Sequence, residues 1–189
     1  MKQFRKSFSI IAIFIMALYV SFSLLFPIVA SAASSEEINV GVDATLKRFG
    51  NEVTGGSEFL KKANGVLVFP KVIKAGVGIG GEYGEGALRI AGKTVEYYST
   101  AAASIGLQLG AQTKSIVLVF LTNNALSNFR KSDGWKAGVD GSVALVEWGV
   151  GEDINTIDIK DPVVGFVFGN KGLMFNLTLE GSKFTKIVK

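Results

Sequence analysis

The stretch that decides the fold runs from Gly65 to Gly110 and has the sequence GVLVFPKVIKAGVGIGGEYGEGALRIAGKTVEYYSTAAASIGLQLG. Gly76 begins a G-x-G-x-x-G spacing, but in a dinucleotide-binding loop this spacing joins a strand to a helix whose first N–H groups face the pyrophosphate. Here more glycines follow instead, and residues 88–90 and 95–97 alternate in polarity on either side of Ala91-Gly92. This pattern predicts a β-hairpin and not a nucleotide site.

Two residue types are missing from the chain, which contains no cysteine and no histidine. Their absence excludes disulfides, thiolate nucleophiles, the Ser-His-Asp triad and metal sites built on Cys or His. The Gly92-Lys93-Thr94 triplet resembles the end of a phosphate loop, but the pattern needs glycine at position 87, where the chain has Ala87. We therefore expect no catalytic residue, no cofactor and no metal ion, and a protein that is not an enzyme.

Carboxylates are the remaining groups with chemistry to consider. Glu82 and Glu85 lie among glycines, but a retaining glycosidase needs two carboxyl groups about 5 Å apart across the scissile bond, which neighbouring turn positions rarely provide. A carboxylate enzyme acting on envelope glycans is thus a less favoured alternative to solvated turn acids. A calcium site is also disfavoured, because the later acids match no EF-hand spacing. These acids are Asp133, Asp140, Glu152, Asp153, Asp158 and Asp161.

The first 32 residues have the pattern of a secretory signal peptide. Lys2, Arg5 and Lys6 precede the apolar stretch 8–20, and Ala30-Ser31-Ala32 offers the small-x-small motif of signal peptidase. We expect cleavage near Ala32 and an exported protein, periplasmic or secreted. The alternative is an uncleaved anchor, because residues 8–26 carry no charge and approach the length of a spanning helix. A lipoprotein is excluded because the chain has no cysteine to carry the lipid.

Charge does not favour a nucleic-acid partner. The chain has 20 Lys and Arg against 16 Asp and Glu, and three of the cations lie in the signal peptide. The remaining domain is therefore nearly neutral, whereas a nucleic-acid-binding domain has a strongly basic face.

Residues 33–56 are predicted to form an amphipathic helix and a linker. Ser34 and Glu37 have capping-box spacing, and apolar residues recur at helical steps up to Phe49. The polar face carries Lys47 and Arg48. Two hypotheses stay open for this helix: it docks on the domain, or it touches a membrane.

The domain itself is predicted over residues 57–189. Ser57 is expected to cap a short helix over 58–63, residues 66–69 form a strand ended by Pro70, and Thr122 or Asn123 caps a helix to about Lys131. Further strands are expected over 105–111, where apolar residues alternate with glycine and glutamine, over 115–121, buried on both faces, and over 142–148. A long polar loop is expected over 149–162, and a meander of three strands over 163–168, 173–179 and 183–188. The fold class is α+β: a mainly antiparallel, strongly coiled or barrel-like sheet of about 7–8 strands with three short helices.

Basic residues beside apolar ones indicate a candidate lipid-binding surface. Lys61, Lys62, Lys71 and Lys74 surround the first strand, next to Phe59, Leu60, Phe69 and Ile73, and Lys47 and Arg48 of the first helix join them as candidates. An anionic lipid surface attracts each nearby cation by about 1 kcal/mol. The alternative is that these lysines only solvate a sheet edge.

Five aromatic residues are candidates either for an apolar pocket or for the core, and core packing is the preferred interpretation. They are Tyr83, Tyr97, Tyr98, Trp135 and Trp148.

Several ordered strings resemble the SYLF domain in its bacterial form. They are Gly65-Val66-Leu67-Val68-Phe69-Pro70, the glycine cluster 78–86, Tyr97-Tyr98-Ser99-Thr100-Ala101, Gly134-Trp135 with 138–141, and the late strings 163–169 and 171–174. The resemblance covers about residues 57–188. It implies a non-enzymatic lipid-binding module, associated in eukaryotes with phosphoinositide membranes and actin, and in bacteria with export.

The expected function is thus an exported lipid- or membrane-surface-binding module of the cell envelope, with an anionic lipid as its ligand. An exported protein meets neither actin nor, as a rule, phosphoinositides, so another anionic lipid is expected. The alternative is an envelope protein that recognises a protein partner or assembles with itself. The sequence leaves the oligomeric state open.

Overall fold

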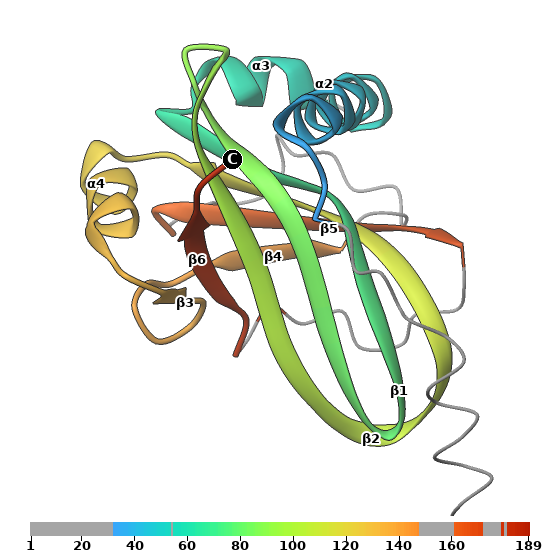
Figure 1. The fold of residues 1–189 in the computed structure, drawn as a ribbon. Coiled ribbons are helices and arrows are strands. Elements are labelled where there is room, and N and C mark those ends of the chain that lie inside the picture. The colour runs from blue at the N-terminus through green and yellow to red at the C-terminus, as the bar shows by residue number, and fades with distance from the viewer. Residues whose placement is uncertain (1–31, 54, 148–160, 172–178, 180) are drawn as a thin grey trace, which may run out of the picture. The chain divides into compact units, whose positions relative to one another are not determined.

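The computed structural model describes residues 32–53, 55–147, 161–171, 179 and 181–189 (Figure 1). The chain divides into two compact units, Met1–Ala32 and Ala33–Lys189, and the description below concerns the second. The predicted signal peptide (apart from Ala32), the predicted loop 149–162 (apart from its last two residues) and most of the predicted strand 173–179 lie outside the described residues. Within the described residues, no helix is both long enough and apolar enough to span a bilayer.

Three helices are described: α2 (Ser35–Glu52), α3 (Gly56–Lys61) and α4 (Asn123–Lys131). The predicted caps of two of them are confirmed, because the Ser34 side chain accepts a hydrogen bond from the Glu37 N–H and Thr122 accepts one from the Ala125 N–H. The predicted cap of α3 is wrong. Gly55 occupies the N-cap with φ 77°, and the Ser57 hydroxyl instead donates to the Gly50 carbonyl oxygen at 3.3 Å.

The described strands are β1 (Gly65–Ile90), β2 (Lys93–Phe120), β3 (Trp135–Lys136), β4 (Ala144–Glu147), β5 (Val163–Lys171) and β6 (Lys183–Ile187). β1 and β2 form the predicted antiparallel hairpin, paired from Ile90↔Lys93 at the turn to Gly65↔Phe120 at the open end. Ala91 (φ 49°) and Gly92 (φ 76°) supply the two left-handed residues of a type I′ turn. The hairpin prediction is therefore confirmed.

Pro70 does not end the first strand, contrary to the prediction. The register shifts from Phe69↔Ile116 to Val72↔Lys114, and the bulge between these pairs accommodates the proline, which has no N–H to donate. The Ser115 hydroxyl donates to the Pro70 carbonyl oxygen at 2.8 Å and ties the bulge to β2. The segments predicted as separate strands over 105–111 and 115–121 likewise belong to one strand, β2, apart from Leu121.

β1 doubles back on itself, and this bend gives the sheet its strong curvature (Figure 1). A Cβ added at Gly84 would lie 2.8 Å from the Lys71 carbonyl oxygen, and one added at Gly86 would collide with the carbonyl oxygen of Val68. Glycine at these two positions lets the second half of the strand approach the backbone of the first half. The predicted fold class, α+β with a mainly antiparallel and strongly coiled sheet, is confirmed.

β2 is the central strand of the described sheet, whose order is β3-β6-β2-β5-β4, and β1 also pairs with β2. β5 pairs with the end of β2, from Thr113 to Phe120, and β6 pairs with its beginning, from Tyr97 to Ala101. β4 runs parallel to β5. Strands are thus found at the two ends of the predicted meander, but they do not pair in meander order: β5 lies between β2 and β4, and β6 lies between β3 and β2, while most of the predicted middle strand lies outside the described residues.

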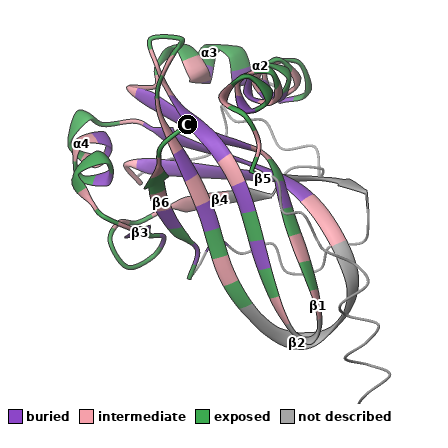
Figure 2. Cartoon of the chain, viewed as in Figure 1, coloured by how far each residue is buried: buried purple, intermediate pink, exposed green. Residues whose placement is uncertain are grey.

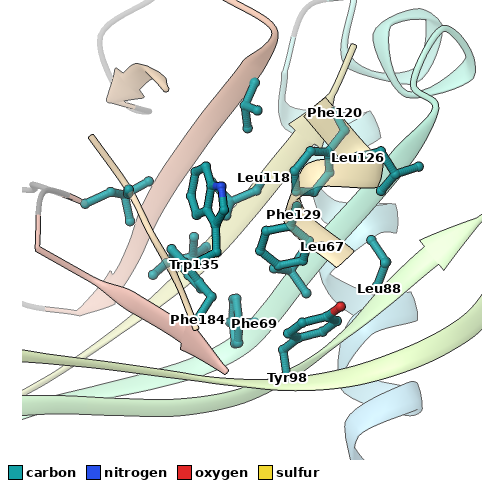
Figure 3. Close-up of a cluster of buried hydrophobic side chains, with 14 of the residues drawn as sticks. Leu67, Phe69, Leu88, Tyr98, Leu118, Phe120, Leu126, Phe129, Trp135 and Phe184 are labelled. Atoms are coloured by element: carbon teal, nitrogen blue, oxygen red, sulfur yellow. The ribbon is translucent and has the colours of Figure 1, made fainter. Parts of the chain in front are cut away.

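The alternating residues of the hairpin build two apolar cores, and Figure 2 shows where buried and exposed positions lie along the strands. Val66, Val68, Val117 and Val119 face outward and are covered by the buried side chains of α2 and α3. In the inner core, buried side chains of the strands pack together with Leu126 and Phe129 of α4, as Figure 3 shows. Its largest members are Phe69, Tyr98, Phe120, Phe129, Trp135 and Phe184. The prediction that residues 115–121 are buried on both faces holds for 115–120, whereas Leu121 is only half-buried.

Candidate functional site

Glu82 and Glu85 point to opposite faces of β1 and do not form a catalytic pair. Glu82 lies on the inner face, where its carboxylate meets the Lys114 ammonium at 2.8 Å, and both side chains are almost completely buried. Glu85 lies on the outer face and accepts hydrogen bonds from Tyr83, Lys189 and the backbone N–H of Ala33. Because successive side chains of a strand point to opposite faces, two acids three positions apart are separated by the sheet itself.

The inner face below the apolar core carries a small group of buried polar side chains. Glu82 and Thr100 lie on neighbouring strands, β1 and β2, and Ser182 directly precedes β6. Glu82 Oε1, Thr100 Oγ1 and Ser182 Oγ have no hydrogen-bond partner among the described protein groups. Buried groups of this kind are usually bridged by ordered water. The Lys114–Glu82 ion pair thus lies buried in the interior beside polar atoms without a protein partner.

The acidic residues considered for a calcium site do not form a metal-binding cluster in the described part of the chain. There, no group of three or more Asp, Glu, His or Cys side chains is close enough to hold an ion. Asp140 accepts a hydrogen bond from the Lys136 N–H at 2.7 Å and closes a local turn. Glu152, Asp153 and Asp158 lie outside the described residues.

Two of the five aromatic candidates belong to the core, which is the interpretation that the sequence analysis favoured. Trp135 and Tyr98 are buried in the inner core beside Phe129. Tyr97 is half-buried, and its hydroxyl accepts a hydrogen bond from the Asn39 side chain at 2.9 Å. Tyr83, in contrast, is 53% exposed. Trp148 lies outside the described residues.

The basic candidates Lys47 and Arg48 lie on α2, and the apolar side of this helix is buried against the sheet. α2 buries Ile38, Val42 and Phe49 against the sheet. Of the two hypotheses for this helix, the structure therefore shows docking on the domain. Lys47 is exposed on its polar side, and Arg48 forms an ion pair with Glu52 at 2.9 Å.

α3 and the residue after it carry the next two basic candidates. Lys61 pairs with Glu58 at 2.7 Å, and this hydrogen bond and charge lower the pKa of Glu58. Lys62 is exposed at the end of the helix. Both side chains of the Lys61–Glu58 pair are 70% exposed, so the pair contributes little to stability.

The remaining two basic candidates lie on β1. Lys71 is exposed at the Pro70 bulge. Lys74 is half-buried and lies opposite Gln112. The six predicted cations are thus distributed over α2, α3 and β1, and the two on β1 flank an exposed apolar side chain of the strand, Ile73.

An exposed apolar face lies on the outside of the sheet near the bend of β1. Ile73 is 44% exposed and Tyr83 is 53% exposed, whereas outward residues beneath the helices, such as Val68 and Ala87, are fully buried. Exposed alanines adjoin them at positions 75, 101 and 103. We call Ile73, Ala75, Tyr83, Ala101 and Ala103 the bend face.

Tyr83 is held in place at the edge of the bend face. Its hydroxyl donates to Glu85 Oε1 at 2.8 Å, and its partial burial and this hydrogen bond raise its pKa to about 12. Tyr83 pairs with Ala101, which pairs in turn with the exposed Lys183 of β6. The face therefore combines small apolar residues and an amphipathic ring, with Lys71 near Ile73 along β1 and Lys183 paired with Ala101.

A second basic feature, which the sequence did not predict, lies beside α4. The Glu96 carboxylate accepts hydrogen bonds from Arg130, Lys186 and the Tyr98 hydroxyl, at distances from 2.6 to 3.0 Å. Burial favours the neutral acid, but these hydrogen bonds outweigh it and lower the pKa of Glu96 to about 2. A groove of about 500 Å³ adjoins this cluster. It is lined by Glu96, Asn123, Leu126, Ser127, Arg130 and Lys131.

Comparison with known proteins relates part of the chain to a known family. Residues 101–187 match the family model Ysc84, described as Las17-binding protein actin regulator. The match begins within β2 and ends with the last residue of β6, so it includes α4 and the strands that pair with β2 from the other side of the hairpin. No curated protein matches the chain. The matched family agrees with the resemblance to the SYLF domain that the sequence strings indicated.

Proposed function

We propose that this chain is an exported, non-enzymatic module that binds anionic lipid surfaces of the cell envelope. The observation that carries the proposal is the bend face, where Ile73 and Tyr83 are exposed: Ile73 lies two residues after the exposed Lys71, and Tyr83 is one strand away from Ala101, the partner of the exposed Lys183. The family's description refers to actin regulation. For an exported protein we propose a lipid surface instead, because such a protein does not meet actin.

The composition of the bend face suits a lipid–water interface. Each cation near an anionic surface contributes about 1 kcal/mol of attraction. Tyrosine is enriched at the interface because its ring is apolar and its hydroxyl is polar. Ile73 adds an apolar side chain that gains free energy when it leaves water. The docked α2 does not offer its apolar side, so we propose that the sheet makes the contact.

Co-sedimentation with vesicles tests this proposal. Residues 33–189 are mixed at low salt with vesicles of phosphatidylglycerol and phosphatidylcholine, and with phosphatidylcholine alone. We expect binding to the anionic vesicles that weakens as salt is added, because salt screens the cations. The double variant K71E/I73S is expected to bind at least about tenfold more weakly.

K93E is the matched control, because Lys93 is also exposed and lies next to the hairpin turn. This variant makes the same charge reversal and is expected to keep most of the binding. Absence of binding to anionic vesicles at low salt would overturn the proposal. Light scattering of the same samples distinguishes the alternative of self-assembly.

A further inference from the structure

Glu85 joins the two ends of the described unit. The Ala33 N–H donates to Glu85 Oε2 at 3.1 Å, and the Lys189 ammonium donates to the same oxygen at 2.8 Å. Lys189 also donates to the Ala33 carbonyl oxygen at 2.9 Å. The side chains of Glu85 and Lys189 are each only 10% exposed. One carboxylate therefore fixes the first and the last residue of the unit.

Ala33, which contacts Glu85, is also the residue that follows the predicted cleavage site. The compact unit begins at Ala33, and the small-x-small motif predicts cleavage directly before this residue. Hydrolysis of the Ala32–Ala33 peptide bond consumes one water and leaves a carboxylate on Ala32 and an ammonium group on Ala33. The single N–H donor that now faces Glu85 would become a cation with three N–H donors.

We propose that Glu85 is the binding site for the α-ammonium group that processing creates at Ala33. The present hydrogen bond already has an ionised acceptor, and cleavage would also give it a charged donor, so the attraction of an ion pair would be added to the hydrogen bond. Removal of residues 1–32 would thereby stabilise the folded domain as well as release it. This inference rests on the proposed export and cleavage, but not on lipid binding.

The Glu85 carboxylate can accept further hydrogen bonds from the new ammonium group. A carboxylate offers about four lone-pair positions, and Glu85 accepts hydrogen bonds from Ala33, Tyr83 and Lys189. Lys189 carries a like charge, so its repulsion reduces the gain. The variant K189M removes this repulsion and is expected to enlarge the effect of the free ammonium group.

Thermal unfolding of proteins with defined first residues tests the proposal. One form of residues 33–189 begins with Ala33, and the other carries one added glycine before it, which moves the ammonium group away from Glu85. We expect the form that begins with Ala33 to melt about 3 °C higher. In E85Q, which keeps the shape of the side chain, the difference between the two forms is expected to disappear.

Two results would overturn the inference. One is an equal melting temperature for the two forms with Glu85 intact, and the other is an unchanged difference in E85Q. Mass measurement of the exported protein tests the cleavage itself: a first residue other than Ala33 would also contradict the proposal. None of these measurements contains lipid, so their failure is distinguishable from failure of the proposed function.

Discussion

Gly86 lies against the carbonyl group of Val68, although both residues belong to the same strand, β1. A side chain at position 86 would collide with this backbone oxygen, which cannot move without disturbing the first half of the strand. We expect G86A to lower the free energy of unfolding by about 3 kcal/mol, measured by urea denaturation.

G81A is the matched control for this variant. A Cβ at Gly81 would lie 3.7 Å from the Ala102 carbonyl oxygen, which is an ordinary contact. Its effect is expected to stay below about 1 kcal/mol. Equal effects of the two substitutions would contradict the close packing of the two halves of β1.

The buried ion pair between Lys114 and Glu82 is expected to show strong coupling. K114M leaves the Glu82 carboxylate buried without its cation and is expected to cost about 3–5 kcal/mol. The double variant E82L/K114M removes both charges and is expected to cost less than the sum of the single changes. Chemical denaturation of the four proteins gives the coupling energy, and additive effects would contradict the pairing.

Acid is expected to destabilise the protein through Glu96. Its pKa is about 2 in the folded protein, below the ordinary value of 4.5, so its stabilising contribution is complete above about pH 4.5 and is lost as the pH falls towards 2. Because Arg130 and Lys186 are partly exposed, the contribution is about 1–2 kcal/mol. Melting temperatures between pH 6 and pH 3 are compared with those of E96Q, which is expected to lose less stability on acidification.

The cations of the helices are expected to matter less for vesicle binding than those near the bend. Lys47 and Lys62 are exposed, but the apolar side of α2 is buried beside them. K47E/K62E is therefore expected to weaken co-sedimentation less than K71E/I73S does. A greater loss in K47E/K62E would move the proposed contact from the bend face to the helices.

The hairpin is predictable from the sequence because its turn is local: Ala91-Gly92 and the alternation around it lie within a few residues. The bend of β1 is not, because the contact between Gly86 and Val68 depends on how far the strand curves. Tyr83 lies on the outer face and is exposed, whereas Tyr98 is buried in the inner core, and the sequence does not distinguish these two environments. The sequence wrongly predicts that Pro70 ends the first strand, because a β-bulge accommodates the proline and the strand continues.

Within the candidate site, Lys71 and its apolar neighbour Ile73 are predictable from the sequence as a basic residue beside an apolar one, because they are close in the chain. It does not predict the cluster around Glu96, whose partners Arg130 and Lys186 are 34 and 90 residues away in sequence. No local spacing brings such residues together. Only the pairing of β6 with β2 and the docking of α4 do so.

The long hairpin also suggests an order of folding. β1 and β2 pair outward from Ala91-Gly92, so each added pair extends a loop that is already closed and costs little further entropy. β5 and β6 both need β2 as a partner. We therefore expect the hairpin to form first and to act as the template on which the later strands assemble.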